Sequence, residues 1–376
     1  MVWIQRLKVQ GVRNIGNAHL QRLSRVNHIY GANGAGKTSV LEALHLLGLG
    51  RSFRSSKQLP IIAHRESSAI VYGELISSPS GIMDSIRSPS LEALVGIGVQ
   101  RNRDGTCEFR INGQRGATTA QLAELLPLQV IDADTFGLLL GPPGTRRQFL
   151  DWGVFHVEHE FLDLWRRLQR ILKQRNSLLR RGKMNTRELG SWDAEFGRLA
   201  ESITDMRSDY FAQWCPVFFE IFNEIGGGEL PAPDIHFSPG WDRRLTAGEM
   251  LKKQLKRDKD VGFTGMGPHR ADLRLRINGL PVGEVLSRGQ LKLVSVAMRL
   301  SQGHMLDLAT GKHCVFLVDD LPAELDRKRR AAVISLLLQR KGQVFFTSVD
   351  KSSLDLSGAD TNTLSVFHVE HGTVHQ

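Results

Sequence analysis

A glycine-rich segment, GANGAGKT at residues 31–38, constrains this chain more than any other feature. It follows an apolar run at 26–30 that is typical of a strand, and it precedes a helical pattern over 39–47. A P-loop requires this order of strand, loop and helix. Glycines let backbone N–H groups converge on phosphate oxygens, and the following helix directs its positive end at the same point. The segment therefore predicts a nucleotide site rather than a plain glycine turn.

Individual residues of this loop have distinct expected roles. Lys37 is expected to reach the β- and γ-phosphates, and the Thr38 hydroxyl is expected to bind Mg²⁺. The residues expected to hold the nucleotide from this segment are Gly31, Ala32, Asn33, Gly34, Ala35, Gly36, Lys37, Thr38 and Ser39.

Composition narrows the class of protein. The chain has 376 residues, 41% of them hydrophobic, which is enough for a large core. Its 49 Lys and Arg against 39 Asp and Glu leave a net charge of +10, which favours a polyanionic partner, although a basic soluble enzyme would look similar.

The cysteines Cys107, Cys215 and Cys314 form no CxxC pair, so neither a disulfide framework nor a zinc site is expected. No apolar run approaches membrane-spanning length and no signal peptide is recognised, so we expect a cytoplasmic protein without a membrane partner.

A second nucleotide element lies near the other end of the chain. The apolar run 314–318 is typical of a buried strand, and Asp319 and Asp320 follow it directly. P-loop enzymes hold Mg²⁺ with an acid at such a strand end, so we expect Asp319 to bind the metal and Asp320 to orient or deprotonate the attacking water. The alternative is an acidic strand cap without chemistry. A further strand at 344–346 ends in Thr347 and Ser348, a candidate sensor of the γ-phosphate or an ordinary strand end.

Upstream of the acidic strand lies LSRGQ, residues 286–290, followed by a helical run. Ser287 is a natural N-cap, and a helix start of this kind presents a hydroxyl and free N–H groups to an anion. Between a P-loop and a double-acid strand it indicates the signature motif of an ABC-type ATPase, with Ser287, Gly289 and Gln290 contacting nucleotide. Asp326 then fits the D-loop. One P-loop and one signature in a chain imply an ATP-dependent homodimer, in which each signature meets the ATP of the other subunit.

The long insertion between these motifs is expected to be helical. Apolar residues recur at three- and four-residue spacing over 161–178 and again over 192–210, which predicts an antiparallel helical hairpin with a basic tip at 180–185. We therefore predict an α/β fold of ABC type: an ATPase lobe from residues 1–152 and 310–376, including a mixed sheet near 68–131, and a helical second lobe, 153–309, that carries the hairpin and the signature.

Basic clusters offer several candidate DNA contacts, which the sequence alone does not rank. Aromatic residues are 7% of the chain and do not alternate with the basic runs, so contacts to the phosphate backbone are favoured over base stacking. A solvated basic helix face is the alternative for the hairpin residues. The clusters are Arg166, Arg167, Arg170, Lys173 and Arg175; Arg51, Arg54 and Lys57; Arg101 and Arg103; and Lys252, Lys253, Lys256, Arg257 and Lys259.

The pentapeptide FHVEH occurs twice, at 155–159 and 367–371. Paired histidines on a helix can bind a transition metal, but no third ligand is evident, and Mg²⁺ prefers oxygen.

Across nearly its whole length the chain resembles the RecF family of recombination mediators, relatives of the SMC-type ABC ATPases. The motifs that carry the resemblance are Arg13-Asn14, GANGAGKTSVLEAL at 31–44, GRSFR at 50–54, GPPGTRRQFLDW at 141–152, GPHRADL at 267–273, SRGQ at 287–290 and DDLPAELD at 319–326. The resemblance implies a cytoplasmic, weak, DNA-stimulated ATPase that dimerises on ATP and binds DNA at single-strand gaps. It further implies action with RecR and RecO in loading RecA for gap repair, replication and the SOS response.

The resemblance also suggests roles for three residues outside the motifs derived above. Arg13 and Asn14 are expected to contact nucleotide phosphates, and Gln129 is expected to be the Q-loop residue that senses Mg²⁺ and the attacking water. The chain departs from ABC proteins at large in having Asp320 where a glutamate is usual, and Thr347 or Ser348 where a histidine is usual. Both departures suit slow hydrolysis that times release from DNA.

Three other interpretations compete with this one. The ATPase of an ABC transporter predicts a GG-containing signature and a shorter span between its motifs. A DNA-binding scaffold that uses ATP only as a structural ligand would not need Lys37, Thr38, Asp319 and Asp320. A P-loop kinase leaves the Ser287 motif and the hairpin unexplained.

Overall fold

The computed structural model describes residues 2–54, 61–77, 93–180, 186–226 and 228–376. Two compact units emerge. The first contains residues 1–135, 224–226 and 296–376, and the second contains 136–223 and 227–295. Their borders at 135/136 and 295/296 precede the predicted lobe borders at 152/153 and 309/310. None of the described helices combines the length and the apolarity that a membrane crossing needs.

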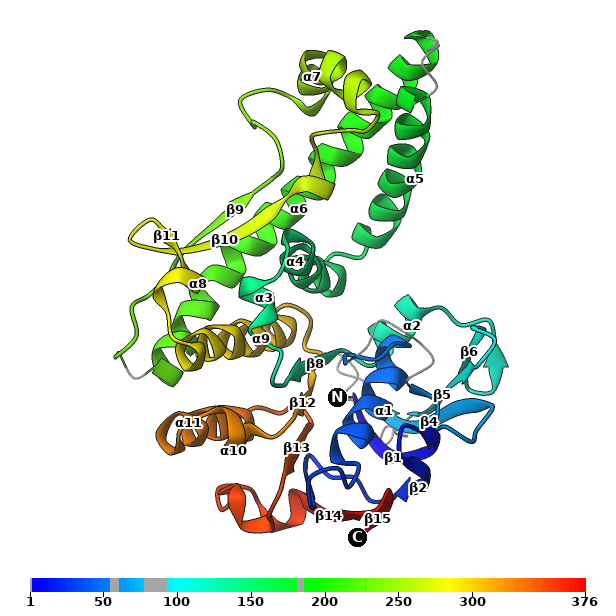
Figure 1. The fold of residues 1–376 in the computed structure, drawn as a ribbon, viewed down its shortest axis with the longest axis vertical. Helices are drawn as coiled ribbons and strands as arrows, with labels where there is room; N and C mark the ends of the chain where they lie inside the picture. The colour runs from blue at the N-terminus through cyan, green and yellow to red at the C-terminus, as the bar shows by residue number, and fades with distance from the viewer. Residues whose placement is uncertain (1, 55–60, 78–92, 181–185, 227) are drawn as a thin grey trace, which may run out of the picture. The chain divides into compact units, whose positions relative to one another are not determined.

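A mostly parallel six-stranded sheet carries the predicted nucleotide motifs (Figure 1). The strands expected from apolar runs are confirmed as β3, β12 and β13, buried along most of their length as expected for parallel strands. β13 lies between β3 and β12, so the residues that follow it sit between the P-loop and the acid pair. The sheet order is β15 (Thr373–His375), β14 (Leu364–Glu370), β3 (Val26–Tyr30), β13 (Val344–Ser348), β12 (Val315–Val318) and β8 (Leu128–Ile131).

The second sheet of this unit is antiparallel. The prediction of one mixed sheet over 68–131 was wrong in its pairing: the strands from 68 to 115 pair with the N-terminal hairpin, whereas residues 128–131 join the parallel sheet. Strands that are close in the sequence therefore need not pair in the same sheet. The order is β2 (Ile15–Leu20), β1 (Val2–Val12), β4 (Ser68–Ser77), β5 (Ala93–Asn102), β6 (Cys107–Ile111) and β7 (Gln114–Arg115).

Helix α1 (Lys37–Leu49) lies in the core of the first unit, which side chains from both sheets share. Its side chains from Val40 to Leu47 are all buried, and α2 (Thr119–Leu125) packs beside it. Burial on all sides holds the start of α1, and with it the P-loop, in a fixed place. The remaining helices of this unit are the end of α9 (Arg288–Thr310) from residue 296 on, α10 (Leu321–Glu324), α11 (Arg327–Gln339) and the short turns at Lys351–Ser353 and Thr361–Thr363.

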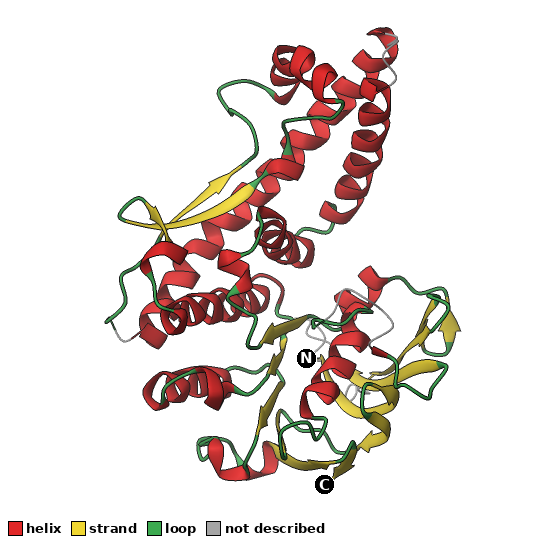
Figure 2. Cartoon of the chain, viewed as in Figure 1, coloured by secondary structure: helices red, strands yellow, loops and turns green. Residues whose placement is uncertain are grey.

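The second unit is mainly helical (Figure 2). The predicted hairpin helices are present as α5 and α6, and α6 runs past the expected end through Pro216; of the predicted tip, residues 181–185 lie outside the described residues. The helices here are α3 (Gly137–Leu140), α4 (Pro143–Val157), α5 (Phe161–Arg180), α6 (Thr186–Gly226), α7 (Ala247–Val261), the turn Pro268–Arg270, α8 (Val282–Val285) and the start of α9 (Arg288–Thr310). A small antiparallel sheet has the order β11 (Leu280–Pro281), β10 (Asp272–Ile277) and β9 (Asp234–Ser238).

Arg175 does not lie on the polar face of the hairpin as predicted. It is fully buried; its Nε pairs with Asp193 at 2.7 Å, and its Nη1 pairs with the buried Asp258 at 2.7 Å. A third bond joins it to the Thr264 hydroxyl at 2.8 Å. Periodicity had placed this arginine among exposed ones, but the carboxylates that compensate its charge come from two other helices, α6 and α7, 18 and 83 residues later in the chain.

Candidate nucleotide-binding site

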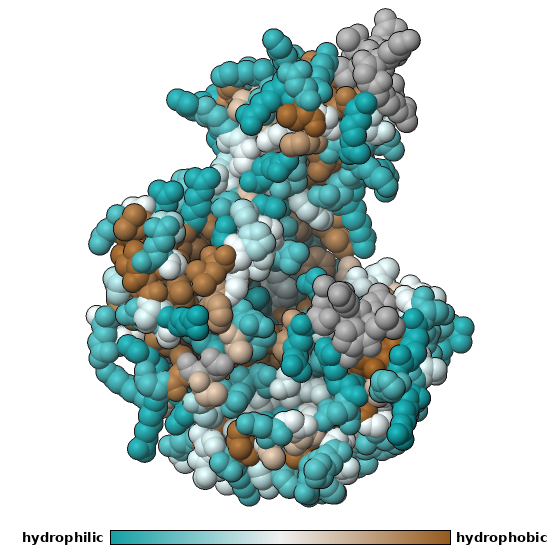
Figure 3. All heavy atoms as spheres, in the orientation of Figure 1, coloured by the Kyte–Doolittle hydropathy of each residue, from teal (hydrophilic) through white to brown (hydrophobic). Residues whose placement is uncertain are grey.

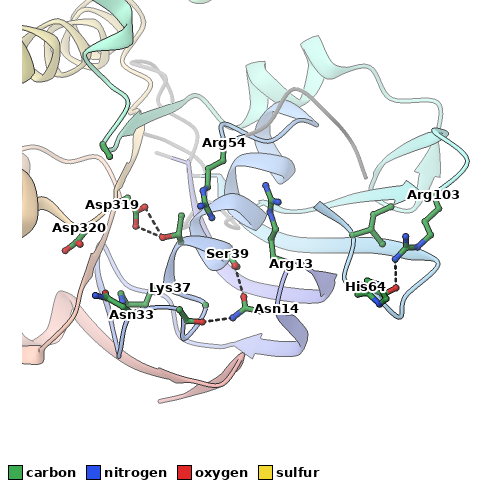
Figure 4. Close-up of a pocket in the computed structure, with 15 residues that line it drawn as sticks. Arg13, Asn14, Asn33, Lys37, Ser39, Arg54, His64, Arg103, Asp319 and Asp320 are labelled. Atoms are coloured by element: carbon green, nitrogen blue, oxygen red, sulfur yellow. Dashed lines mark hydrogen bonds between the residues drawn. The ribbon is translucent and has the colours of Figure 1, made fainter. Parts of the chain in front are cut away.

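An open cavity of about 790 Å³ lies in the first unit, and its size falls in the range of small-molecule sites (Figure 4). The P-loop, the acid pair and the N-terminal turn all border it. Its lining comprises Arg13, Asn14, Asn33, Gly34, Gly36, Lys37, Thr38, Ser39, Arg54, Ile62, His64, Arg103, Ala133, Asp319 and Asp320.

The P-loop backbone requires glycine at two of its positions for different reasons. Gly36 has φ 121°, a conformation that L side chains rarely adopt, and it begins α1 with no side-chain cap. A Cβ on Gly31 would lie 2.1 Å from the Val369 carbonyl oxygen, so the loop passes too close to β14 for any side chain. The uncapped first turn of α1 leaves N–H groups available to an anion.

The side chain of Lys37 folds back over the P-loop and bonds to its backbone. Its ammonium donates to the Gly31 carbonyl at 2.7 Å and to the Ala32 carbonyl at 3.0 Å. Burial lowers the pKa of Lys37, and the carboxylates of Asp320 and Asp319 oppose that shift. The same cation thus borders the cavity from the loop side while the acid pair borders it from the sheet.

Asp319 is the centre of a hydrogen-bonded cluster at the end of β12. The Thr38 hydroxyl donates to its carboxylate at 2.9 Å, and the Thr347 hydroxyl donates to it at 2.6 Å. The Thr347 oxygen in turn accepts from the backbone N–H of Asp320 at 2.9 Å. Asp320 itself is left-handed, with φ 45°, where an aspartate is more readily tolerated than a bulky residue. Tertiary structure therefore brings together residues from three distant parts of the chain.

The donors in this cluster suit magnesium. A threonine hydroxyl and a carboxylate in direct contact are hard oxygen ligands of the type that Mg²⁺ takes. Thr38 and Asp319 are the residues that would hold the ion.

Ser348 has a different environment from Thr347. His28 of β3 bonds to its hydroxyl at 2.8 Å, and that hydroxyl donates to the Asp350 carbonyl at 2.7 Å. Burial, followed by the charge of Lys351, lowers the pKa of His28 to about 4. Of the two candidate sensors at the end of β13, Thr347 is the one that contacts the acid pair.

The N-terminal turn braces the P-loop. The Asn14 amide donates to the Gly34 carbonyl at 3.0 Å, and the Ser39 hydroxyl donates to Asn14 Oδ1 at 2.8 Å. Arg13 has a left-handed backbone conformation, with φ 56°. Its guanidinium donates two hydrogen bonds of 2.8 Å to the carboxylate of the buried Glu42 of α1. Both turn residues line the cavity, and their contact with phosphates stays a prediction.

Gln129 is placed differently from its prediction. It lies within β8 with 1% of its surface exposed, and it is absent from the cavity lining. Its amide donates to Gln302 at 3.1 Å and accepts from Arg299 at 3.0 Å, both on α9. The structure thus places Gln129 between β8 and α9 rather than at the cavity, and its Q-loop role stays a prediction. Ala133, beyond the end of β8, lines the cavity instead.

Three polar cavity residues were not predicted as nucleotide contacts: Arg54, His64 and Arg103. Arg54 lies shortly after the end of α1, in the GRSFR motif that the resemblance had singled out, so this motif could have indicated Arg54 as a cavity residue. Arg103 donates to the carbonyls of Ala63, His64 and Glu66 and so holds the turn that carries His64. Only the pairing of the antiparallel sheet places this turn at the cavity. Lys57, predicted with Arg54, lies outside the described residues.

The signature residues lie in the second unit. Ser287 and Gln290 form a reciprocal capping box at the start of α9: the Ser287 N–H bonds to the Gln290 side chain at 2.9 Å, and the Gln290 N–H bonds to the Ser287 hydroxyl at 3.4 Å. Ser287 and Gly289 are exposed. Asp326, predicted in the D-loop, caps α11.

The two FHVEH copies do not share a conformation. The first ends α4 and the second forms most of β14. Among the described residues there is no group of three or more His, Cys, Asp or Glu side chains that could hold a metal.

Comparison with known proteins agrees with this geometry. Residues 3–375 match the family model of the RecF/RecN/SMC N-terminal domain. The DNA replication and repair protein RecF of Pseudomonas syringae pv. tomato is 43% identical over 99% of this chain and 98% of its own. That of Pseudomonas aeruginosa is 44% identical over 99% of this chain and 97% of its own.

Solved structures give the same fold. A structure of the recombination mediator protein RecF with ATP has a TM-score of 0.82 at 23% identity, over 100% of this chain and 97% of that one. The Smc head domain of Pyrococcus furiosus has a TM-score of 0.57 at 17% identity, over 100% of this chain and 95% of that one.

Proposed function

The chain belongs to the RecF family of DNA replication and repair proteins, and we propose that it acts as an ATP-dependent, DNA-binding recombination mediator. The observation that carries the proposal is the contact of Thr38 with Asp319 inside the cavity that Lys37 and Asp320 also line. The two halves of an ATPase site, far apart in the sequence, meet there.

The residues of this cavity suggest a division of labour in hydrolysis. The Lys37 ammonium would leave its hydrogen bonds to the two loop carbonyls and bind the β- and γ-phosphates, because a phosphate is the stronger acceptor. Bound magnesium would neutralise charge on the phosphates. Asp320 would orient or deprotonate the attacking water, while Thr347 holds its backbone. An aspartate is one methylene shorter than glutamate, which suits slow turnover, and we propose a weak, DNA-stimulated ATPase.

ATP would also join two copies of the chain. Ser287, Gly289 and Gln290 of one protomer would contact the nucleotide held by the P-loop of the other, since the start of the 23-residue helix α9 is a natural anion site. Arg13, Asn14 and Arg54 would add contacts to the phosphates from within each protomer. Hydrolysis would then release the dimer.

The cellular role that we propose follows the relatives. Solved relatives are described as recombination mediators of the RecFOR pathway. We propose that this chain binds DNA at single-strand gaps and, with RecR and RecO, supports RecA loading in gap repair, replication and the SOS response. Its net charge of +10 is compatible with binding a polyanion.

Sedimentation with ATP and Mg²⁺, with and without gapped DNA, tests this proposal. We expect an ATP-dependent dimer that DNA supports, and we expect Ser287→Arg to remain monomeric because its side chain would crowd the composite site. A monomer under all conditions would contradict the composite site. Single-turnover hydrolysis, measured in parallel, separates a slow ATPase from a scaffold that only binds ATP, because the scaffold would leave the bound ATP intact.

A further inference from the structure

Helix α7 presents a basic face. Two carboxylates lie within electrostatic range of it, Glu249 near Lys252 and Asp242 near Lys253. Its five exposed cations fall within eight residues, and none of them forms an ion pair with a described residue. They are Lys252, Lys253, Lys256, Arg257 and Lys259. In Figure 3, hydrophilic side chains cover the surface of the second unit where Figure 1 places this helix.

Several other exposed arginines of the second unit are paired, whereas Arg170 and Lys173 of α5 form no ion pair with a described residue either. Arg166 pairs with Asp163 at 3.7 Å, and Arg167 and Arg198 both pair with Glu195. In the loop before α7, Arg243 pairs with Asp205 at 2.7 Å and Arg244 with Asp242 at 2.7 Å. These cations already have partners, so an external anion would have to compete for them.

The spacing on α7 aligns its lysines. Lys252, Lys256 and Lys259 are separated by four and three residues and therefore share one face of the helix. The buried residues Leu251 and Asp258 occupy a different face. At a rise of about 1.5 Å per residue, the three lysines span about 10.5 Å along the axis.

The acids of α7 are mostly engaged elsewhere. Glu249 bonds to Thr246 in the capping box that begins the helix. Asp258 is buried against Arg175. Asp260 alone is exposed without such a partner among the acids of this helix. The outer face consequently carries a local excess of positive charge.

α7 is held firmly in place. At its start, the Ala247 N–H donates to Glu201 of α6 at 2.9 Å. Near its end, the buried Arg175–Asp258 pair joins it to α5, and the Gly265 N–H donates to Asp258 at 3.0 Å. Beyond the helix, Thr264 bonds to Asn176 of α5 through its N–H and its hydroxyl. A clamped helix presents its charges at fixed positions, which lowers the entropic cost of binding.

We propose that the lysine face of α7, residues 252, 256 and 259, docks on the phosphate backbone of duplex DNA. The inference rests on the proposed DNA-binding function and assigns a surface to it. Duplex DNA carries one charge per about 1.7 Å of axis, so a rigid row of about 10.5 Å meets several phosphates. α7 has no aromatic residue on which unpaired bases would stack, which favours duplex over single strand.

The test replaces Lys252, Lys256 and Lys259 together by glutamine, which keeps helix propensity. The matched control, Arg166→Gln with Arg167→Gln and Arg198→Gln, removes the same net charge from arginines that are already paired. Affinity for a fluorescent duplex is measured by anisotropy in ATP and Mg²⁺ at several salt concentrations. Sedimentation with ATP checks that each variant still dimerises.

We expect the α7 variant to bind the duplex at least about tenfold more weakly at about 0.1 M salt, and to show a log–log salt slope smaller by about 2.7, at about 0.9 per lost phosphate contact. The control should stay within about twofold. Equal losses in both variants, or a wild-type salt slope in the α7 variant, would overturn the assignment while leaving the DNA-binding function intact.

Two further outcomes would also overturn it. Wild-type protein that binds no DNA in ATP would remove the proposed function as well. Wild-type protein that binds anionic phosphatidylglycerol vesicles through α7 but not the duplex would assign these lysines to a membrane surface.

Discussion

The Thr347 hydroxyl donates a 2.6 Å hydrogen bond to the Asp319 carboxylate, while its oxygen accepts the backbone N–H of Asp320 at 2.9 Å. One side chain thus holds both acids of the candidate site. It can do so because β13 lies between the P-loop strand and the acid-bearing strand. The hydroxyl is fully buried, so water does not compete for these bonds.

Replacing Thr347 by valine, which has nearly the same shape but no hydroxyl, should slow ATP hydrolysis by about 10- to 100-fold because both acids lose their support. Binding of ATP should change little, since Lys37 and the P-loop are intact. Single-turnover hydrolysis and binding of a fluorescent ATP analogue measure the two effects. Thr347→Ser keeps the hydroxyl and serves as the control; a slow serine variant would indicate a packing defect instead.

Asp320→Asn should keep ATP binding and dimerisation but lose most of the hydrolysis, because the amide cannot accept a proton from water. The dimer should therefore persist on DNA, as measured by dissociation from gapped DNA after dilution. Lys37→Ala is the comparison, and it should lose ATP-driven dimerisation. Rapid dissociation of the asparagine variant despite normal ATP binding would argue against hydrolysis as the release step.

Gln129→Ala should reduce stability rather than act directly on chemistry. The change removes one hydrogen-bond partner from Gln302 and one from Arg299, at a cost of about 2–4 kcal/mol in the free energy of unfolding. Urea denaturation measures this cost, and hydrolysis is measured per folded molecule. A stable variant with greatly reduced hydrolysis would support the Q-loop role of Gln129.

His28 should make stability fall in mild acid. Its pKa is lowered to about 4 in the folded protein, mainly by burial, so between this value and its ordinary 6.5 the unfolded chain binds the proton more readily. The free energy of unfolding therefore has its full value above about pH 6.5 and falls as the pH is lowered. His28 accounts for a loss of about 2 kcal/mol at pH 5. Urea denaturation at pH 7 and pH 5 tests this.

His28→Gln should reduce the loss of stability between pH 7 and pH 5 by about 2 kcal/mol, whereas replacing the exposed His19 by glutamine should not change it. If both variants retain the full acid sensitivity, other buried histidines account for it. His45, whose pKa burial lowers to about 4, is the next to replace.

Much of the local structure was predictable. Apolar runs located β3, β12 and β13, and three-and-four spacing located α5 and the central part of α6, because each pattern is a local consequence of one-sided or complete burial. Pairing between strands was not predictable. Residues 128–131 left the neighbouring strands for the parallel sheet, and nothing in their own composition indicates which edge they join.

Some residues of the candidate site were predictable from the sequence, and others were not. Lys37, Thr38 and Asp319 were identified from motifs whose spacing follows directly from phosphate and metal chemistry. Arg103 and His64 reach the cavity through an antiparallel sheet that no motif describes. Arg175 looked like an exposed helix residue until α6 and α7 supplied its carboxylates.

The repeated pentapeptide FHVEH separates the two kinds of information most clearly. In α4 it buries His156 and leaves Phe155 partly exposed; in β14 it buries Phe367 and Val369. Five identical residues have identical local propensities, so the difference arises from their neighbours: an established helix before one copy, and the open edge of β3 beside the other. The sequence by itself determined the phosphate loop, the acid pair and the helical hairpin, because their patterns are local. Tertiary structure alone decided the sheet partners, the buried charges and the full lining of the cavity, because those depend on contacts between residues far apart in the chain.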